Sequence, residues 1–132
     1  MKEKKRILGI DYGTKRVGVA VSDLAREFAL PLTVVANAHD LLAEIIKIAT
    51  DNEVGEIVLG ESRDFKGKPN PIFQDVEKFK KQLEVNNYVV YWELEFMTSI
   101  QAERLQGKHD KIDASAAALI LQAYLDRERN EN

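Results

Sequence analysis

The spacing of apolar and polar residues changes along the chain, and each change marks a different predicted element. Residues 7–10 form an apolar run typical of a buried strand. Residues 16–22 alternate three valines with glycine, alanine and serine, which is the period of a half-buried strand. The segment between them, residues 11–15, is short and contains a glycine. The pattern therefore predicts an antiparallel hairpin.

The next two elements are separated by a change from strand to helix spacing. A third strand is predicted within residues 28–36, where Pro31 restricts it to a sheet edge or a bulge. Residues 39–53 then place their leucines and isoleucines at helical spacing, with Asn37 or Asp40 as the expected N-cap.

The second half of the chain alternates strands and helices. Residues 56–60 predict a short buried strand, and residues 61–70 a polar loop. A helix follows over 70–84, where Asn70 can cap and Pro71 suits the first turn. Its apolar stripe consists of Ile72, Val76, Phe79 and Leu83. Residues 88–96 are rich in aromatic and β-branched side chains and predict a strand.

Two helices end the predicted order. The first covers 98–107, which has a capping-box pattern and a terminal glycine. The second runs from about residue 110 to 127, and its alanines allow close approach to a sheet. Three strands followed by alternating helices and strands predict a mixed five-stranded α/β sheet, antiparallel at first and then parallel, flanked by helices. This order resembles the ribonuclease H-like fold.

Composition narrows the class of protein. A chain of 132 residues is the size of one domain, so we expect a single domain over residues 1–132. The 45% hydrophobic and 31% charged residues are typical of a soluble globular protein, and no apolar run is long enough to span a membrane. The start lacks the apolar region of a secretory signal, and the absence of cysteine excludes thiolate chemistry. We therefore expect a cytoplasmic location.

The charge is unevenly distributed. The net charge of −3 argues against a protein that coats nucleic acid through bulk charge, but it leaves room for a local basic surface. Basic residues gather in three groups: Lys2, Lys4, Lys5, Arg6, Lys15 and Arg16; Arg63, Lys66 and Lys68; and Arg104, Lys108 and Lys111.

Three acidic residues lie at or near the ends of three separated predicted elements. Asp11 ends the first strand, Glu95 lies near the end of the last strand, and Asp113 falls in the first turn of the last helix. Strand alternation places Glu93 on the same face as Glu95. Glu93 is therefore a candidate auxiliary ligand. Ligands gather at the carboxyl ends of parallel strands, and carboxylates are the hard oxygen ligands that hold Mg²⁺ or Mn²⁺.

Each acid also has a purely structural interpretation. Asp11 can stabilise its turn through an Asx hydrogen bond, and Asp113 can complement the helix dipole. Glu95 on its own is typical of a surface residue.

Four stretches resemble, in order and spacing, the YqgF/RuvX family: "ILGIDYGTKRVGVAVSD", "IVLGESRDFKGKPNP", "LEFMTSIQAERL" and "KIDASAAALILQAYLD". The resemblance implies a ribonuclease H-like fold and a nuclease linked to maturation of the 5′ end of 16S ribosomal RNA and, by similarity, to Holliday junction resolution. Its acidic catalytic and metal site falls on Asp11, Glu95 and Asp113. The chain departs from the family pattern around Glu95, where Leu94 and Phe96 replace the usual aspartate and arginine.

The resemblance implies metal-assisted phosphodiester hydrolysis. Two Mg²⁺ or Mn²⁺ ions, roughly 3.5 to 4 Å apart, would activate the attacking water and neutralise the leaving oxygen. The partner would be nucleic acid, either a 16S rRNA precursor or branched DNA. The protein would act either as a monomer or as a homodimer. The expected phosphate contacts are Lys15, Arg16, Arg63 and Lys66.

Two other classes compete with the nuclease. The stretch "DYGT" resembles the first phosphate loop of the actin and sugar-kinase ATPases, but those bind nucleotide between two such domains and this length supplies one. A non-catalytic RNA- or ribosome-binding module on the same scaffold is the second, and divalent-metal binding distinguishes it from the nuclease.

Overall fold

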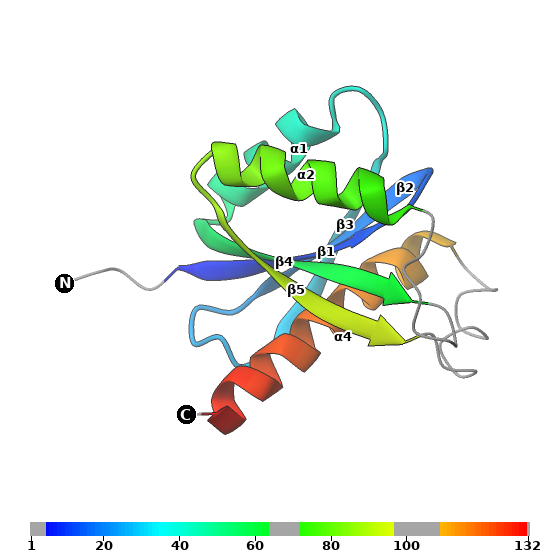
Figure 1. The fold of residues 1–132 in the computed structure, drawn as a ribbon. Helices are drawn as coiled ribbons and strands as arrows, with labels where there is room; N and C mark the ends of the chain where they lie inside the picture. Colours follow the sequence, from blue (N-terminus) through cyan, green and yellow to red (C-terminus); the bar gives the residue numbers. More distant parts are fainter. Residues whose placement is uncertain (1–4, 64–71, 97–108, 132) are drawn as a thin grey trace.

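The computed structural model describes residues 5–63, 72–96 and 109–131, which form a five-stranded sheet with helices on both faces (Figure 1). The elements are β1 (Arg6–Tyr12), β2 (Arg16–Ser22), β3 (Ala29–Ala36), α1 (Leu41–Asp51), β4 (Val54–Arg63), α2 (Phe73–Val85), β5 (Val89–Phe96) and α4 (His109–Glu131).

The strands lie in the order β3-β2-β1-β4-β5. The first three strands pair antiparallel, whereas β1, β4 and β5 run parallel to one another. This confirms the predicted mixed sheet, and it brings the carboxyl ends of β1, β4 and β5 to the same edge. We call this edge the carboxyl edge.

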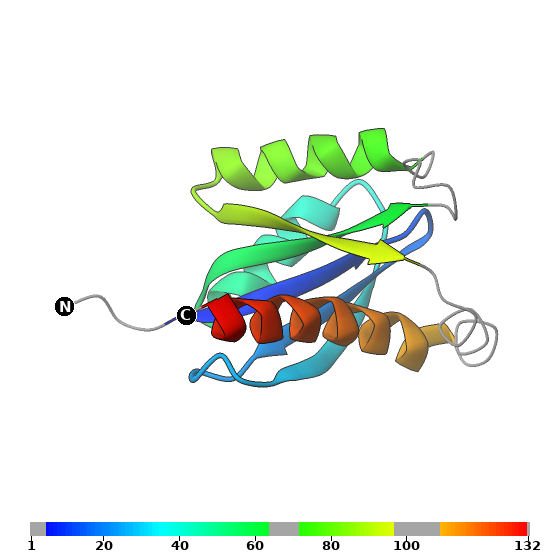
Figure 2. The ribbon, with the colours of Figure 1, turned by 60° about the horizontal axis from the view of Figure 1, so that its bottom comes forward.

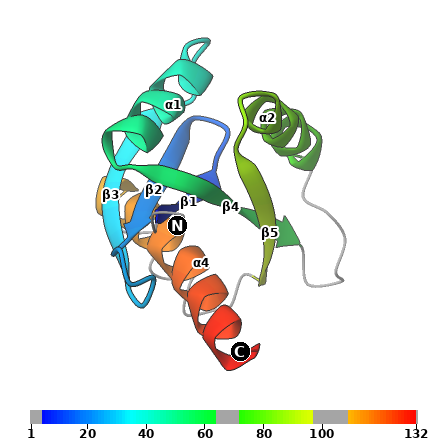
Figure 3. The ribbon, with the colours of Figure 1, turned by 90° about the vertical axis from the view of Figure 1, so that its left-hand side faces the viewer.

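Each face of the sheet has its own core. Helices α1 and α2 cover one face and α4 covers the other (Figure 3). The first core is made of large aliphatic side chains and Phe79, including the predicted stripe of α2, which is confirmed for Val76, Phe79 and Leu83. The second core is smaller and consists of Ile7, Ala20, Val58, Ala117, Ile120, Leu121, Tyr124 and Leu125.

The prediction that residues 16–22 form a half-buried strand is wrong. Every residue of β2 after Arg16 is buried, because α4 covers the face on which the small residues lie. The predicted close approach of the last helix is confirmed. A Cβ atom on Gly9 would lie 2.7 Å from the Leu121 Cβ and 3.0 Å from the Ala117 carbonyl oxygen. The small residues of this face are thus its packing surface.

Strand β3 meets both predictions made from Pro31. It lies at the edge of the sheet, and its register with β2 shifts between the pairs Val19–Thr33 and Ala20–Pro31. A proline lacks the N–H that a regular ladder requires, so an edge position with an irregular register accommodates it.

Several predicted boundaries differ from the structure. The strand predicted over 56–60 extends through Val54–Arg63, so residues 61–63 continue the strand that we expected to end in a loop. Asp40 is the N-cap of α1, but its side chain makes no capping hydrogen bond. The helix predicted over 98–107 and the predicted cap at 70–71 lie outside the described residues. No helix within the described ranges is long and apolar enough to cross a membrane.

Candidate active site at the carboxyl edge

Asp11 lies near the carboxyl end of β1, directly opposite Gly18 of β2. The strand continues one residue further than predicted, through Tyr12. Because strand residues alternate between faces, Asp11 shares a face with Gly9, which contacts α4. Tyr12 lies on the opposite face, where its ring packs 5.5 Å from that of Phe79. Asp11 is therefore a half-buried acid on the α4 face, next to a strand neighbour without a side chain.

Asp113 lies in the second turn of α4, one turn before Ala117. Helix α4 runs antiparallel to β1, with its first residues at the carboxyl edge (Figures 1 and 2). Ala117 sits over Gly9. One helical turn back from Ala117 is roughly 6 Å, and two strand residues forward from Gly9 span roughly 6.6 Å. Both steps lead toward the carboxyl edge, so the backbone positions of Asp11 and Asp113 lie at the same end of the same face.

Glu95 is the penultimate residue of β5, in register with Ser62 of β4. It comes two residues after Glu93, whose side chain reaches the α4 residue Arg127. Strand β4 separates β1 from β5, and the strand register places Glu93 level with Asp11, two strand spacings away. Glu95 lies two residues further along β5, so its backbone is roughly 12 Å from that of Asp11.

The fold thus brings the three predicted acids to one edge at the level of the backbone. The side chains of Glu95 and Asp113 lie outside the described part of the structure. Among the side chains that the structure describes, no three potential ligands form a metal-binding group. The metal site formed by these acids stays a prediction.

Glu93, the expected auxiliary ligand, is occupied by another interaction. Its Oε1 atom lies 2.8 Å from the Arg127 Nη2, an ion pair without hydrogen-bond alignment, and this oxygen has no hydrogen-bond partner among the described residues. Burial raises the pKa of Glu93, and the positive charge of Arg127 offsets part of that rise. Arg127 also lies over the Tyr124 ring, 5.7 Å from its centroid, and Tyr124 stacks on Tyr91. This acid therefore joins α4 to β5.

The expected phosphate contacts are only partly described. Lys15 and Arg16 are exposed at the turn between β1 and β2, close in sequence to Asp11. Arg63 is the last residue of β4, where its backbone pairs with Phe96, and Lys66 lies outside the described residues. The structure thus brings Lys15 and Arg16 near the edge that carries Asp11.

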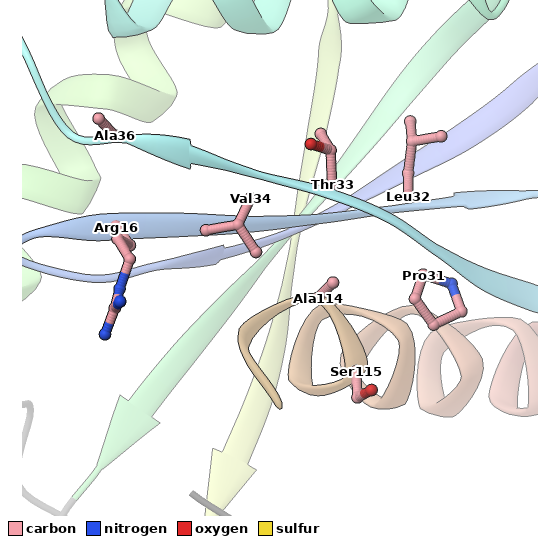
Figure 4. Close-up of a pocket in the computed structure, with 8 residues that line it drawn as sticks. All are labelled: Arg16, Pro31, Leu32, Thr33, Val34, Ala36, Ala114 and Ser115. Atoms are coloured by element: carbon pink, nitrogen blue, oxygen red, sulfur yellow. The ribbon is translucent and has the colours of Figure 1, made fainter. Parts of the chain in front are cut away.

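A shallow groove begins at Arg16 and runs along the edge strand. It has a volume of about 670 Å³ and is lined by residues of β3 and by Ala114 and Ser115 of α4. Figure 4 shows Val34 and Pro31 between β3 and the helix, with the Arg16 side chain at one end of the groove. Since Ala114 and Ser115 directly follow Asp113, the groove opens beside the candidate site.

Asn37 takes a position that the sequence did not predict. It is one of the two residues predicted as the N-cap of α1, but Asp40 takes that position and the Asn37 Nδ2 donates to the Gly13 carbonyl oxygen at 2.8 Å. Its backbone N–H donates to the Lys15 carbonyl oxygen at 2.9 Å. A single residue that follows β3 thus holds both ends of the turn after Asp11. In the sequence, an asparagine just after a strand looks the same whether it caps the next helix or binds a distant turn.

The comparisons with known proteins show the family of this chain. The family model described as "RuvX: Holliday junction resolvase" matches residues 5–127. A protein of Endomicrobium trichonymphae named "Putative pre-16S rRNA nuclease" is 35% identical, with 96% of this chain and 99% of that protein covered. A protein of the same name from Thermoanaerobacter pseudethanolicus is 34% identical, with 96% and 99% covered.

The fold is similar to that of a solved structure. The structure of T. thermophilus RuvC in complex with a Holliday junction substrate superposes with a TM-score of 0.57. The match covers 95% of this chain and 96% of that one, at 13% identity. The sheet order and helix layers define a ribonuclease H-like α/β protein. Within that class, the chain belongs to the RuvX family, as the matched residues and the two relatives show.

Proposed function

We propose that this protein is a metal-dependent nuclease that hydrolyses phosphodiester bonds during maturation of the 5′ end of the 16S rRNA precursor. The observation that supports the proposal is that the backbone positions of Asp11 and Asp113 lie toward the same end of the α4 face in a member of the RuvX family. The names of the two relatives support the RNA substrate.

Asp11, Glu95 and Asp113 are the residues that would hold Mg²⁺ or Mn²⁺. Their carboxylates are hard oxygen donors that suit these cations. Gly18, opposite Asp11, presents no side chain that would compete for the space. Divalent ions bound there would supply an activated water and stabilise negative charge on the leaving oxygen. Asp11 is the central residue of the proposed site because β1 lies between the other strands of the sheet.

The basic residues of the β1–β2 turn would orient the substrate. Lys15 and Arg16 would neutralise backbone phosphates, a role that depends on charge rather than on base identity. Arg63 and Lys66 are proposed for the same role. The groove beside Arg16 would receive the nucleotides next to the scissile phosphate, since it opens beside Asp113.

Branched DNA is the second candidate substrate. The description of the matching family model names Holliday junction resolution, and this favours a junction as the alternative to RNA. A non-catalytic RNA-binding module is the third reading, and the departures at Leu94 and Phe96 favour it.

Three wider expectations accompany the proposal. We expect the protein to act in the cytoplasm and to consist of one domain over residues 1–132. A homodimer is one of its two candidate oligomeric states, the other being a monomer. Exposed apolar side chains lie in and before the edge strand β3, at Leu24, Phe28, Leu30 and Leu32. They are the surface on which a second copy would pack, and light scattering of the purified protein measures this directly.

The proposed function is tested by cleavage of two substrates side by side. A 16S precursor RNA with a 5′ extension and a four-way DNA junction are incubated with the protein in Mg²⁺ or Mn²⁺. We expect cleavage of the RNA, and a loss of at least about 1,000-fold in Asp11→Asn, because a neutral amide is a poor ligand for a hard cation. Melting curves check that the variant is folded. Cleavage of the junction alone would assign the DNA substrate, and wild-type activity in folded Asp11→Asn would remove Asp11 from the mechanism.

A further inference from the structure

The turn between β1 and β2 is tight. Tyr12 pairs with Val17, so the chain reverses within four residues. A Cβ atom on Gly13 would lie 2.5 Å from the Arg16 carbonyl oxygen, a distance that no side chain tolerates. The residue at position 13 therefore has to be glycine, and the turn takes a compact shape that places Thr14 and Lys15 on the surface.

Asn37 is the residue from outside the hairpin that holds this shape. Its side-chain amide and its backbone N–H bind the carbonyl oxygens of Gly13 and Lys15, at 2.8 and 2.9 Å. Asn37 is half-buried, so these bonds are shielded from water in part. Both contacts bind main-chain atoms, and they therefore fix the path of the turn whatever side chains it carries.

We propose that Asn37 is a positioning residue of the nuclease, which fixes the β1–β2 turn so that its exposed residues meet the phosphate next to Asp11. This inference rests on the proposed function. Asn37 itself would not touch the substrate, and it would act through the backbone of residues 13–15. Because the turn starts two residues after Asp11, a displaced turn would carry Lys15 away from a phosphate bound at the carboxyl edge.

A matched control exists at the other end of the sheet. Asn52 is also half-buried, and its Nδ2 donates to the Ile48 carbonyl oxygen at 2.8 Å. It lies at the end of α1, before the first residue of β4, and thus at the edge opposite the candidate site. Asn52→Ala removes the same kind of hydrogen bond as Asn37→Ala, but it leaves the turn intact.

The test compares the two alanine variants in steady-state cleavage of the precursor RNA. We expect Asn37→Ala to lower kcat/KM about tenfold, the order of one net hydrogen bond, whereas Asn52→Ala keeps the wild-type value. Asn37→Asp should lose more, because its carboxylate would face the Gly13 carbonyl oxygen. An equal loss in Asn37→Ala and Asn52→Ala would overturn the proposal, since it would reduce the effect to general stability.

A double-mutant cycle distinguishes positioning from an independent role. If Asn37 acts through the turn, its removal has a smaller effect once Lys15 is replaced by alanine, so the two losses are less than additive. Strictly additive losses would contradict the proposal.

Hydrogen exchange separates failure of this inference from failure of the proposed function. In Asn37→Ala we expect faster exchange of the amides of residues 13–16, and in Asn52→Ala no change there. If the wild type cleaves nothing, the proposed function fails even though the exchange result stands. If the wild type cleaves RNA and Asn37→Ala matches it in both rate and exchange, only the role of Asn37 fails.

Discussion

The two faces of the sheet differ in the size of their side chains and in the charges that they bury. The face under α1 and α2 carries large aliphatic side chains and no buried charge among its described residues. The face under α4 carries glycine and alanine at the points of closest approach, together with Asp11 and the buried Glu93. Large side chains hold helices at a distance through packing, whereas small ones bring the helix backbone close to the sheet.

This difference explains where an acidic site can form. Because Gly9 admits the backbone of α4, the start of that helix comes close to the end of β1, and an acid on each backbone can contribute to one site. On the other face, the same close approach would require removal of the large leucine, isoleucine and phenylalanine side chains of the core. We therefore expect the α1/α2 face mainly to stabilise the fold and the α4 face mainly to position the proposed site.

The largest effect on stability is expected on the α1/α2 face. Leu83 is fully buried in α2, so Leu83→Ala should lower the free energy of unfolding by about 2 to 5 kcal/mol through lost packing and a cavity. Cleavage per folded molecule should stay within about twofold of the wild type, because α2 lies on the face away from the acids. Denaturant unfolding measures the first quantity, and assays well below the melting temperature measure the second. A selective loss of turnover would break the division between the faces.

A smaller substitution on the α4 face should lower both the free energy of unfolding and the cleavage activity. Gly9→Ala would place its methyl group against Leu121 and the Ala117 backbone, so α4 must shift. We expect a loss of about 1 to 3 kcal/mol in the free energy of unfolding and a larger proportional loss of cleavage, since α4 also carries Asp113.

Gly55→Ala is the matched control for that substitution. Its methyl group would meet the Lys5 side chain, 2.9 Å from Cδ, and a flexible lysine can move aside. Cleavage should be unchanged in this variant. If Gly9→Ala loses stability and activity no more than Gly55→Ala, the close approach of α4 has no part in forming the site.

The smallest effect is expected at Glu93. Because burial raises its pKa, the folded protein binds a proton at this carboxyl more tightly than the unfolded chain does, and wild-type stability falls as the pH rises through that pKa. Glu93→Gln abolishes this dependence. At pH 7 the free energy of unfolding should change by less than about 1 kcal/mol, since Arg127 is half exposed and can be hydrated.

The comparison that checks this is unfolding of wild type and Glu93→Gln at several pH values. The wild type should gain stability relative to the variant as the pH falls through the raised pKa of Glu93 toward the ordinary glutamate range. Cleavage should be kept, because Glu93 pairs with Arg127. Loss of cleavage in Glu93→Gln would instead return Glu93 to the site as a ligand.

Local patterns in the sequence predicted much of the fold. The stripe of α2, the edge position of Pro31 and the close approach of the alanine-rich helix each follow from residues near one another in the chain. The spacing of apolar residues and the special properties of proline and alanine are local properties, so they can be interpreted without a fold.

The failures have a common physical cause. Helix α4, almost a hundred residues later in the sequence, buries the face of β2 that carries the small residues. The clamp from Asn37 to Gly13 and the ion pair from Glu93 to Arg127 also join distant residues. An asparagine or a glutamate has the same local propensity whether its partner is a cap, a turn, a cation or a metal. The sequence therefore predicted which acids to test, and the fold shows which of them share an edge.

We propose that acids from separate elements of the α4 face form one metal site, and calorimetric titration of Mn²⁺ measures this most directly. Wild type and Glu93→Gln should bind the ion equally, whereas Asp11→Asn and Asp113→Asn should each lose at least about tenfold in affinity while staying folded. If Asp113→Asn binds Mn²⁺ as the wild type does and loses only a little stability, Asp113 serves the helix dipole and the claim of a shared site is wrong.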